Sequence, residues 1–204
     1  MKHKIIFPAQ QKGMTDLNND LEAYGLSIKE AEKILIKAAE KSSKMTGKAC
    51  DHIGEIIKSN RANWLDEYNN DKLLCKWFGK AEDPIHIRGV HNRMESACNR
   101  IDDGLTLHLR PQNKMPKSAK GNGTHFGPKA MKIFPSIFEN STKPDEIASV
   151  FIHELLLMWF RDLKSKDMEL NKDEFVRKLA KEAPKKARLN AANYERFFKE
   201  LSSA

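Results

Sequence analysis

Apolar residues recur at helical spacing along most of the chain, and only two short segments alternate instead. The clearest helical run consists of Ile28, Ala31, Ile34, Leu35 and Ala38, with lysines and glutamates between them. Ser27 and Glu30 stand at the spacing of a capping box, which predicts that this helix begins at Ser27. The same spacing predicts further helices over residues 49–59, 64–77, 87–101, 173–183 and 191–201.

Strict alternation over residues 105–109 predicts a strand, and residues 130–138 predict a second one. Pro135 lies within the second strand, so we expect an edge position there. Residues 1–26 show no sustained period and predict a loosely attached N-terminal arm, followed by one domain over residues 27–204. We therefore expect a predominantly helical α+β fold, with a small short-stranded sheet and a central buried helix over about residues 145–163.

Composition narrows the class of protein. The 204 residues are 40% hydrophobic, which is enough for one compact core, and 31% charged, which excludes collagen-like and low-complexity chains. No run of about 18 apolar residues exists, so we expect no membrane span. The net charge of +8 is spread diffusely, and few aromatic residues accompany the lysines. We therefore expect these charges to form a solvated surface rather than a nucleic-acid or anionic-surface interface.

The N-terminus and the cysteines indicate the cellular compartment in which we expect the protein. The segment before Pro8 has only a short apolar patch, which does not match a classical signal peptide. We expect a protein that is cytoplasmic in the cell that produces it, or that is exported by a route that does not require a classical signal peptide. Cys50, Cys75 and Cys98 are widely spaced and form no CxxC motif, so we expect buried thiols, with one disulfide left open.

His153 and Glu154 interrupt the most apolar predicted helix, which begins at Pro144. A histidine and a glutamate inside such a helix are costly unless they have partners. In the motif HExxH two histidines four residues apart bind zinc, and the glutamate activates the zinc-bound water. Here Leu157 stands at the second histidine position, so the alternative is a core histidine that is satisfied by a neighbour.

Several segments outside this helix resemble one peptidase family. Residues 188–201, RLNAANYERFFKEL, are similar to its N-A-D-x-x-x-x-F segment, and Trp77-Phe78-Gly79 resembles its W/Y-F-G. The two predicted strands and the helix with His153 and Glu154 lie between them in the family's order. Over about residues 28–204 the chain thus resembles the aspzincin metalloendopeptidases, which include deuterolysin and the peptidyl-lysine metallopeptidases.

The resemblance implies a zinc ion held by two histidines and an aspartate, with a glutamate as the general base. His153 matches the first ligand and Glu154 the base, whereas Leu157 replaces the second ligand. Asp167 is the best match for the aspartate ligand, and Asp162 is the second best.

The resemblance also implies a tyrosine that stabilises the oxyanion. Leu170 stands at that position, and Ala192 stands where N-A-D has its aspartate. Tyr194 is our candidate for a catalytic or supporting role, since the segment that contains it matches one near the family's active site.

A catalytic zinc site normally has three protein ligands, so we expect no bound zinc and no other cofactor. We predict a degenerate metallopeptidase-like domain that acts by binding a protein, as a bacterial secreted effector or a toxin-associated protein would. The first alternative is an active zinc endopeptidase in which His125 or His108 substitutes for the missing ligand. The second is a basic protein that binds nucleic acid or an anionic surface.

Overall fold

The chain forms two compact units. The computed structural model describes residues 2–117, 124–126, 130–157 and 172–203. Unit 1 comprises Met1–Ser43 and Arg100–Glu154, and unit 2 comprises Lys44–Asn99 and Leu155–Ala204.

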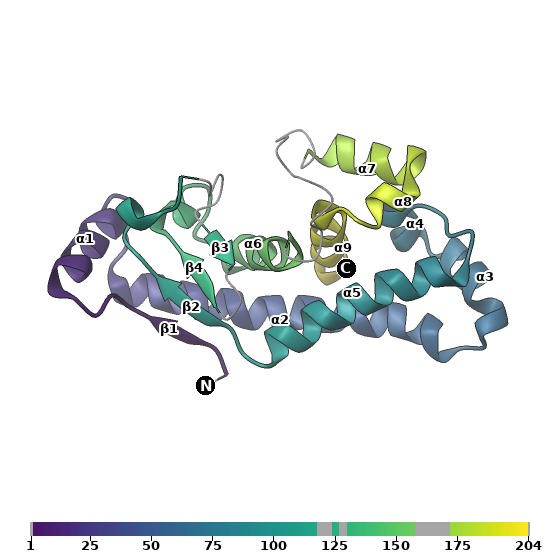
Figure 1. Ribbon diagram of the computed structural model, residues 1–204, viewed down its shortest axis with the longest axis horizontal. Helices are drawn as coiled ribbons and strands as arrows, with labels where there is room; N and C mark the ends of the chain where they lie inside the picture. Colours follow the sequence, from purple (N-terminus) through teal and green to yellow (C-terminus); the bar gives the residue numbers. More distant parts are fainter. Residues whose placement is uncertain (1, 118–123, 127–129, 158–171, 204) are drawn as a thin grey trace. The chain divides into compact units, whose positions relative to one another are not determined.

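Unit 1 contains a small sheet of short strands, as the alternating segments predicted (Figure 1). The strands are β1 (Lys4–Ile6), β2 (Thr106–Leu109), β3 (Thr124–Phe126) and β4 (Met131–Ile133). Their order is β1-β2-β4-β3; β1, β2 and β4 are parallel, and β3 is antiparallel to β4. Leu107 and Leu109 are fully buried while Thr106 and His108 are half-buried, so one face of β2 packs against the core.

The expected edge position of Pro135 is wrong. Strand β4 ends at Ile133 and lies between β2 and β3, so it is an interior strand among the described residues. Pro135 comes after the strand and begins the 3-10 helix η3 (Pro135–Phe138). The missing N–H of proline therefore removes no hydrogen bond from the sheet.

The first 26 residues contain a strand and a helix, which differs from a loosely attached arm. Strand β1 pairs with β2, with Lys4 opposite Thr106. Helix α1 (Gln11–Glu22) buries Leu17 and Leu21 completely. With the half-buried Met14 they form a stripe of only three apolar residues, which is too short to show a sustained period.

Helix α2 (Ile28–Lys58) begins with the predicted capping box. The Ser27 N–H donates to the Glu30 carboxylate at 2.8 Å, and the Glu30 N–H donates to Ser27 Oγ at 3.3 Å. The sequence predicted two helices here, but α2 is continuous. Ser42 and Thr46 are fully buried at the positions where the apolar stripe seemed to stop, so small polar residues continue the buried face.

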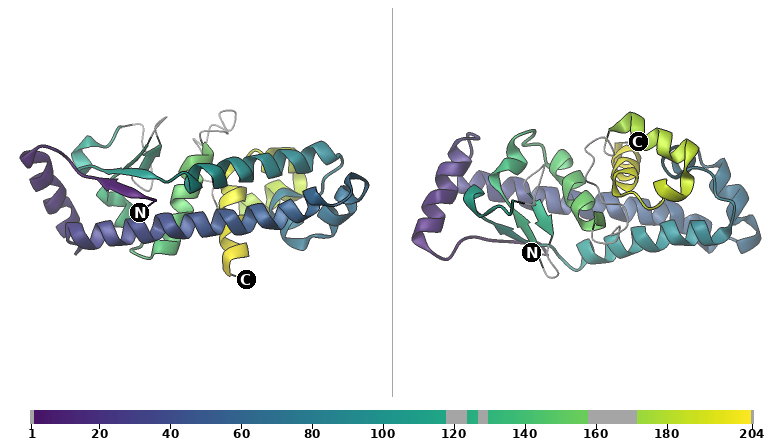
Figure 2. Two further views of the ribbon diagram at one scale, coloured as in Figure 1. Left: turned by 90° about the horizontal axis from the view of Figure 1, so that it is seen from below. Right: turned by 45° about the horizontal axis from the view of Figure 1, so that its top comes forward.

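Unit 2 consists of helices in its described part (Figures 1 and 2). They include the last part of α2, most of α5 (Pro84–Asp102), η1 (Arg61–Asn63), α3 (Trp64–Asn70), α4 (Lys72–Phe78), α7 (Asp173–Glu182), α8 (Pro184–Ala187) and α9 (Ala191–Ser203). The predicted helix over 64–77 is divided at Asp71, whose carboxylate accepts the N–H groups of Leu73 and Leu74 at 2.8 Å each. Asp71 is thus the N-cap of α4.

Aromatic side chains form the centre of unit 2. Phe78, at the end of α4, lies 4.6 Å from Tyr194 and 5.4 Å from Phe197 between ring centroids, and all three residues are fully buried. Gly79 follows with φ 68°, which ends α4 as predicted. The two segments that carried the family resemblance, 77–79 and 188–201, therefore pack against each other.

All three cysteines of the chain are reduced thiols. Cys50, Cys75 and Cys98 are not in disulfide bonds, and each is half-buried rather than buried as expected. In the described part of the chain, every helix is too short or too polar to span a membrane.

Candidate metal centre

Helix α6 (Pro144–Leu157) carries His153 and Glu154 in its last turns. Asp145 and Glu146 lie in its first turn, where the helix dipole favours acidic side chains. The predicted helix extended to about residue 163, but residues 158–171 lie outside the described part. Asp162, Asp167 and Leu170 are among them.

One side of α6 is more exposed than the rest. Phe151, Ile152, Leu155 and Leu156 are fully buried, as predicted for a core helix. From residue 150 onward, the half-buried residues are Val150, His153, Glu154 and Leu157. Their spacing of three and four places them on a single face, which we call the α6 stripe. The helix is therefore buried on most sides but not all round.

The described residues of the α6 stripe do not fit a zinc site. His153 and Leu157 are four residues apart on the stripe, where HExxH would place two ligands, and a leucine has no lone pair to donate. Among residues 2–117, 130–157 and 172–203, no three His, Cys, Asp or Glu side chains are grouped so that they could hold a metal ion. His153 and Glu154 each interact with other groups of the chain instead.

His108, a candidate substitute ligand, lies among cations. Its Nδ1 is 3.3 Å from the guanidinium of Arg110, and β2 places it opposite Lys132 of β4. Burial, Arg110, Lys132 and Lys4 together lower the pKa of His108. The same positive charges oppose a divalent cation, so His108 is a poor zinc ligand. His125, the other candidate, pairs with Lys132 across the β3–β4 ladder.

Tyr194 and Ala192 lie on α9, where both are fully buried. The Tyr194 hydroxyl donates to the backbone carbonyl of Arg188 at 2.9 Å. Burial raises the pKa of Tyr194, while Arg93 and Arg188 act in the opposite direction. This hydroxyl therefore supports the turn before α9; its catalytic role stays a prediction.

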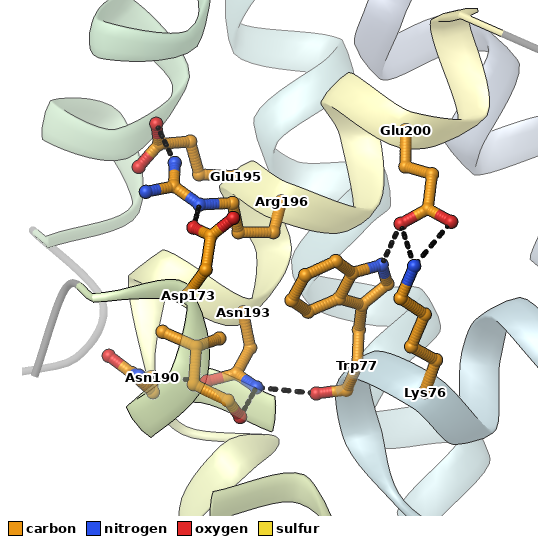
Figure 3. A network of polar contacts seen from close by, with 9 residues as sticks. Lys76, Trp77, Asp173, Asn190, Asn193, Glu195, Arg196 and Glu200 are labelled. Carbon is orange, nitrogen blue, oxygen red and sulfur yellow. Dashed lines mark hydrogen bonds and ion pairs between the residues drawn. The ribbon is translucent and has the colours of Figure 1, made fainter. Parts of the chain in front are cut away.

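Asn193 organises a buried polar network beside Tyr194 (Figure 3). Its Nδ2 donates to the carbonyls of Trp77 at 2.5 Å and Val176 at 3.1 Å, and its Oδ1 accepts from Asn190 Nδ2 at 2.8 Å. Asn193 is fully buried, and it joins α4, α7 and α9. The sequence pattern did not predict this role; its one sign is an amide among the apolar residues of the segment RLNAANYERFF.

Comparison with known proteins supports the fold. No family model matches the chain, and no curated protein matches it in sequence. Among solved structures, a zinc peptidase from Grifola frondosa matches with a TM-score of 0.59 and 16% identity, covering 86% of this chain and 97% of that one. The chain therefore has a zinc-peptidase-like, aspzincin-like fold, and the predicted helical α+β class is confirmed. An identity this low does not transfer ligands or activity.

Proposed function

We propose that this zinc-peptidase-like domain is catalytically degenerate and acts by binding another protein. One observation carries the proposal: Leu157 stands four residues after His153 on the α6 stripe, where a second ligand would be needed. This replacement and the sequence resemblance are the support for the proposed pseudoenzyme role. They also support the proposal that the domain is a bacterial secreted effector with a protein partner.

Loss of the metal removes the chemistry that Glu154 would assist. A zinc ion lowers the pKa of its bound water from about 15.7 to about 7, and a carboxylate alone does not. Two ligands hold zinc far more weakly than the usual three. Without the metal, Glu154 cannot act as the base of a peptidase.

The composition of the α6 stripe suits protein binding. Val150 and Leu157 offer half-buried apolar surface at its two ends, and the polar residues His153 and Glu154 lie between them. Protein interfaces combine apolar contacts with a few directed polar ones in this manner.

The alternative is an active zinc endopeptidase in which His125 or His108 substitutes for the missing ligand. With His153 and Asp167 or Asp162, such a histidine would complete a set of three protein ligands. A peptidase assay on an unfolded protein substrate, with zinc added, separates the two. We expect no cleavage above that of a Glu154→Gln control. Cleavage that both Glu154→Gln and a chelator abolish would establish the alternative.

Binding is tested separately from catalysis. A partner captured by the intact protein is identified by mass spectrometry, purified, and titrated against the parent, Leu157→Asp and the matched surface variant Lys178→Asp. We expect Leu157→Asp to weaken binding at least about tenfold, because a buried apolar contact is replaced by a charge, and Lys178→Asp to leave it nearly unchanged. Equal effects of the two variants would show that the α6 stripe is not the binding surface.

A further inference from the structure

A pocket of about 450 Å³ opens on unit 2, between the end of α4 and the facing residues of α7 and α8. Its volume is within the range of about 300–1,000 Å³ that small-molecule sites occupy. All of its lining residues belong to unit 2, and His153 and Glu154 are not among them. The pocket is therefore separate from the α6 stripe.

The pocket is strongly basic. Four of its eight lining residues are cationic, namely Lys76, Lys80, Arg177 and Lys181, and none is acidic. Among the described residues, Lys76 is the one pocket cation with an anionic partner, since both carboxylate oxygens of Glu200 lie 2.6 Å from its Nζ (Figure 3). Within the described part of the chain, Lys80, Arg177 and Lys181 form no ion pair. Three of the four cations that line this concavity thus have no carboxylate partner among the described residues.

Close packing of the backbone holds the walls of the pocket together. Gly79, with φ 68°, allows the chain to turn at the end of α4. A Cβ at this residue would contact the carbonyl oxygen of Ala180 and lie only 2.8 Å from the Pro184 side chain. Arg177 is positioned in addition by Trp77, whose ring centroid lies 5.5 Å from its guanidinium carbon. The Trp77 ring therefore restrains the Arg177 guanidinium before any ligand binds, which reduces the entropic cost of binding.

We infer that this pocket binds a small soluble anion carrying several phosphate charges, such as a diphosphate. The planar guanidinium of Arg177 can donate two parallel hydrogen bonds to one phosphate group, and Lys80 and Lys181 supply point charges. Cys75, Ala180 and Pro184 complete the lining with largely apolar atoms, which a carbon skeleton attached to the phosphate can contact. This site goes beyond the proposed binding of a protein and does not depend on it.

The test is titration calorimetry of the intact protein with inorganic pyrophosphate. We expect one saturable site, with affinity at least about tenfold weaker in Arg177→Gln and in Lys181→Gln, because each variant removes a charge-assisted hydrogen bond. Lys178→Gln is the matched control, since Lys178 is on the same helix but lies 4.0 Å from Glu182 and outside the pocket. Lys181 is exposed, so its replacement does not threaten folding.

Alkylation of the cysteines locates the bound anion. Cys75 lines the pocket, whereas Cys50 and Cys98 do not. We expect pyrophosphate to slow the alkylation of Cys75 by iodoacetamide, read by peptide mass mapping, and to leave the other two thiols unaffected. Absence of saturable binding, an equal loss in Lys178→Gln, or unprotected Cys75 would each overturn the inference.

Discussion

The imidazole of His3 accepts a hydrogen bond through Nδ1 from the backbone N–H of Leu105, at 3.0 Å. His3 is 4% exposed, and this bond connects the residue before β1 to the residue before β2. A protonated imidazole has no acceptor nitrogen, so the bond requires the neutral ring. Burial and the charge of Lys2 lower the pKa of His3, while Glu40 and Asp102 act in the opposite direction.

The pH dependence of stability should reveal this bond. Because the pKa of His3 is lower in the folded state than the value of 6.5 expected for an exposed ring, its contribution is present above pH 6.5 and is lost as the pH falls below it. His3→Asn keeps an acceptor near the position of Nδ1 but does not titrate. We expect urea unfolding to show a smaller loss of stability between neutral pH and mildly acidic pH in His3→Asn than in the parent. Identical pH profiles would contradict this assignment.

Asn193→Ala should destabilise the protein strongly. The substitution leaves the carbonyls of Trp77 and Val176 without this donor, and Asn190 without its acceptor, in a fully buried site. Each buried polar group left unsatisfied costs about 1–3 kcal/mol, so we expect a loss of about 2–4 kcal/mol in the free energy of unfolding. Asn92→Ala, on the exposed side of α5, is the control and should change stability by less than about 0.5 kcal/mol. A loss below about 1 kcal/mol in Asn193→Ala would contradict the expected contribution of this network to the free energy of unfolding.

Helix positions and caps were the most predictable part of the fold. The capping box of Ser27 and Glu30 and the helix end at Gly79 were correct because each depends on a few neighbouring residues. The sequence predicted a break inside α2 that does not exist, because Ser42 and Thr46 are buried although they are polar. Strand β1 was missed, since a three-residue strand depends on its partner about 100 residues away and has no period of its own.

Asp71 has two roles that substitution can separate. It caps α4, and its carboxylate lies 2.7 Å from Nε2 of His52. The hydrogen bond to Asp71 raises the pKa of His52 against the effect of its burial. Burial opposes the ionisation of Asp71, but His52 and the N–H groups of Leu74 and Leu73 lower its pKa overall.

Asp71→Asn should keep the cap and remove the ion pair. We expect the pKa of His52, measured by NMR titration, to fall in this variant, and Asp71→Ala to lose about 1 kcal/mol more stability than Asp71→Asn. In the parent, the His52 contribution is present below pH 6.5 and is lost as the pH rises through the raised pKa. An unchanged pKa of His52 in Asp71→Asn would refute the pairing.

The candidate site was predictable only in part. His153, Glu154 and Leu157 could be placed on one helix face from their spacing, and α6 has that arrangement. The partial exposure of the α6 stripe could not be predicted from the sequence, because it depends on which parts of the fold pack against each face of the helix. The network of Asn193 was missed for a related reason, since its acceptors are backbone carbonyls that leave no mark in the sequence.

Leu157→His should increase the affinity for zinc. The variant restores the pair of histidines at positions i and i+4, beside Glu154, and Asp167 or Asp162 would be the third ligand. We expect added zinc to raise the melting temperature of Leu157→His more than that of the parent or of Leu157→Gln, which is equally polar but a poor zinc ligand. If zinc affects Leu157→His and Leu157→Gln alike, His153 and residue 157 do not face a vestigial metal site.

Elemental analysis of the freshly purified protein tests the central claim most directly. We expect far less than one zinc ion per chain and no change in melting temperature after chelation, because Leu157 replaces one ligand of the set that the family resemblance implies. About one zinc per chain, lost on chelation together with thermal stability, would contradict it.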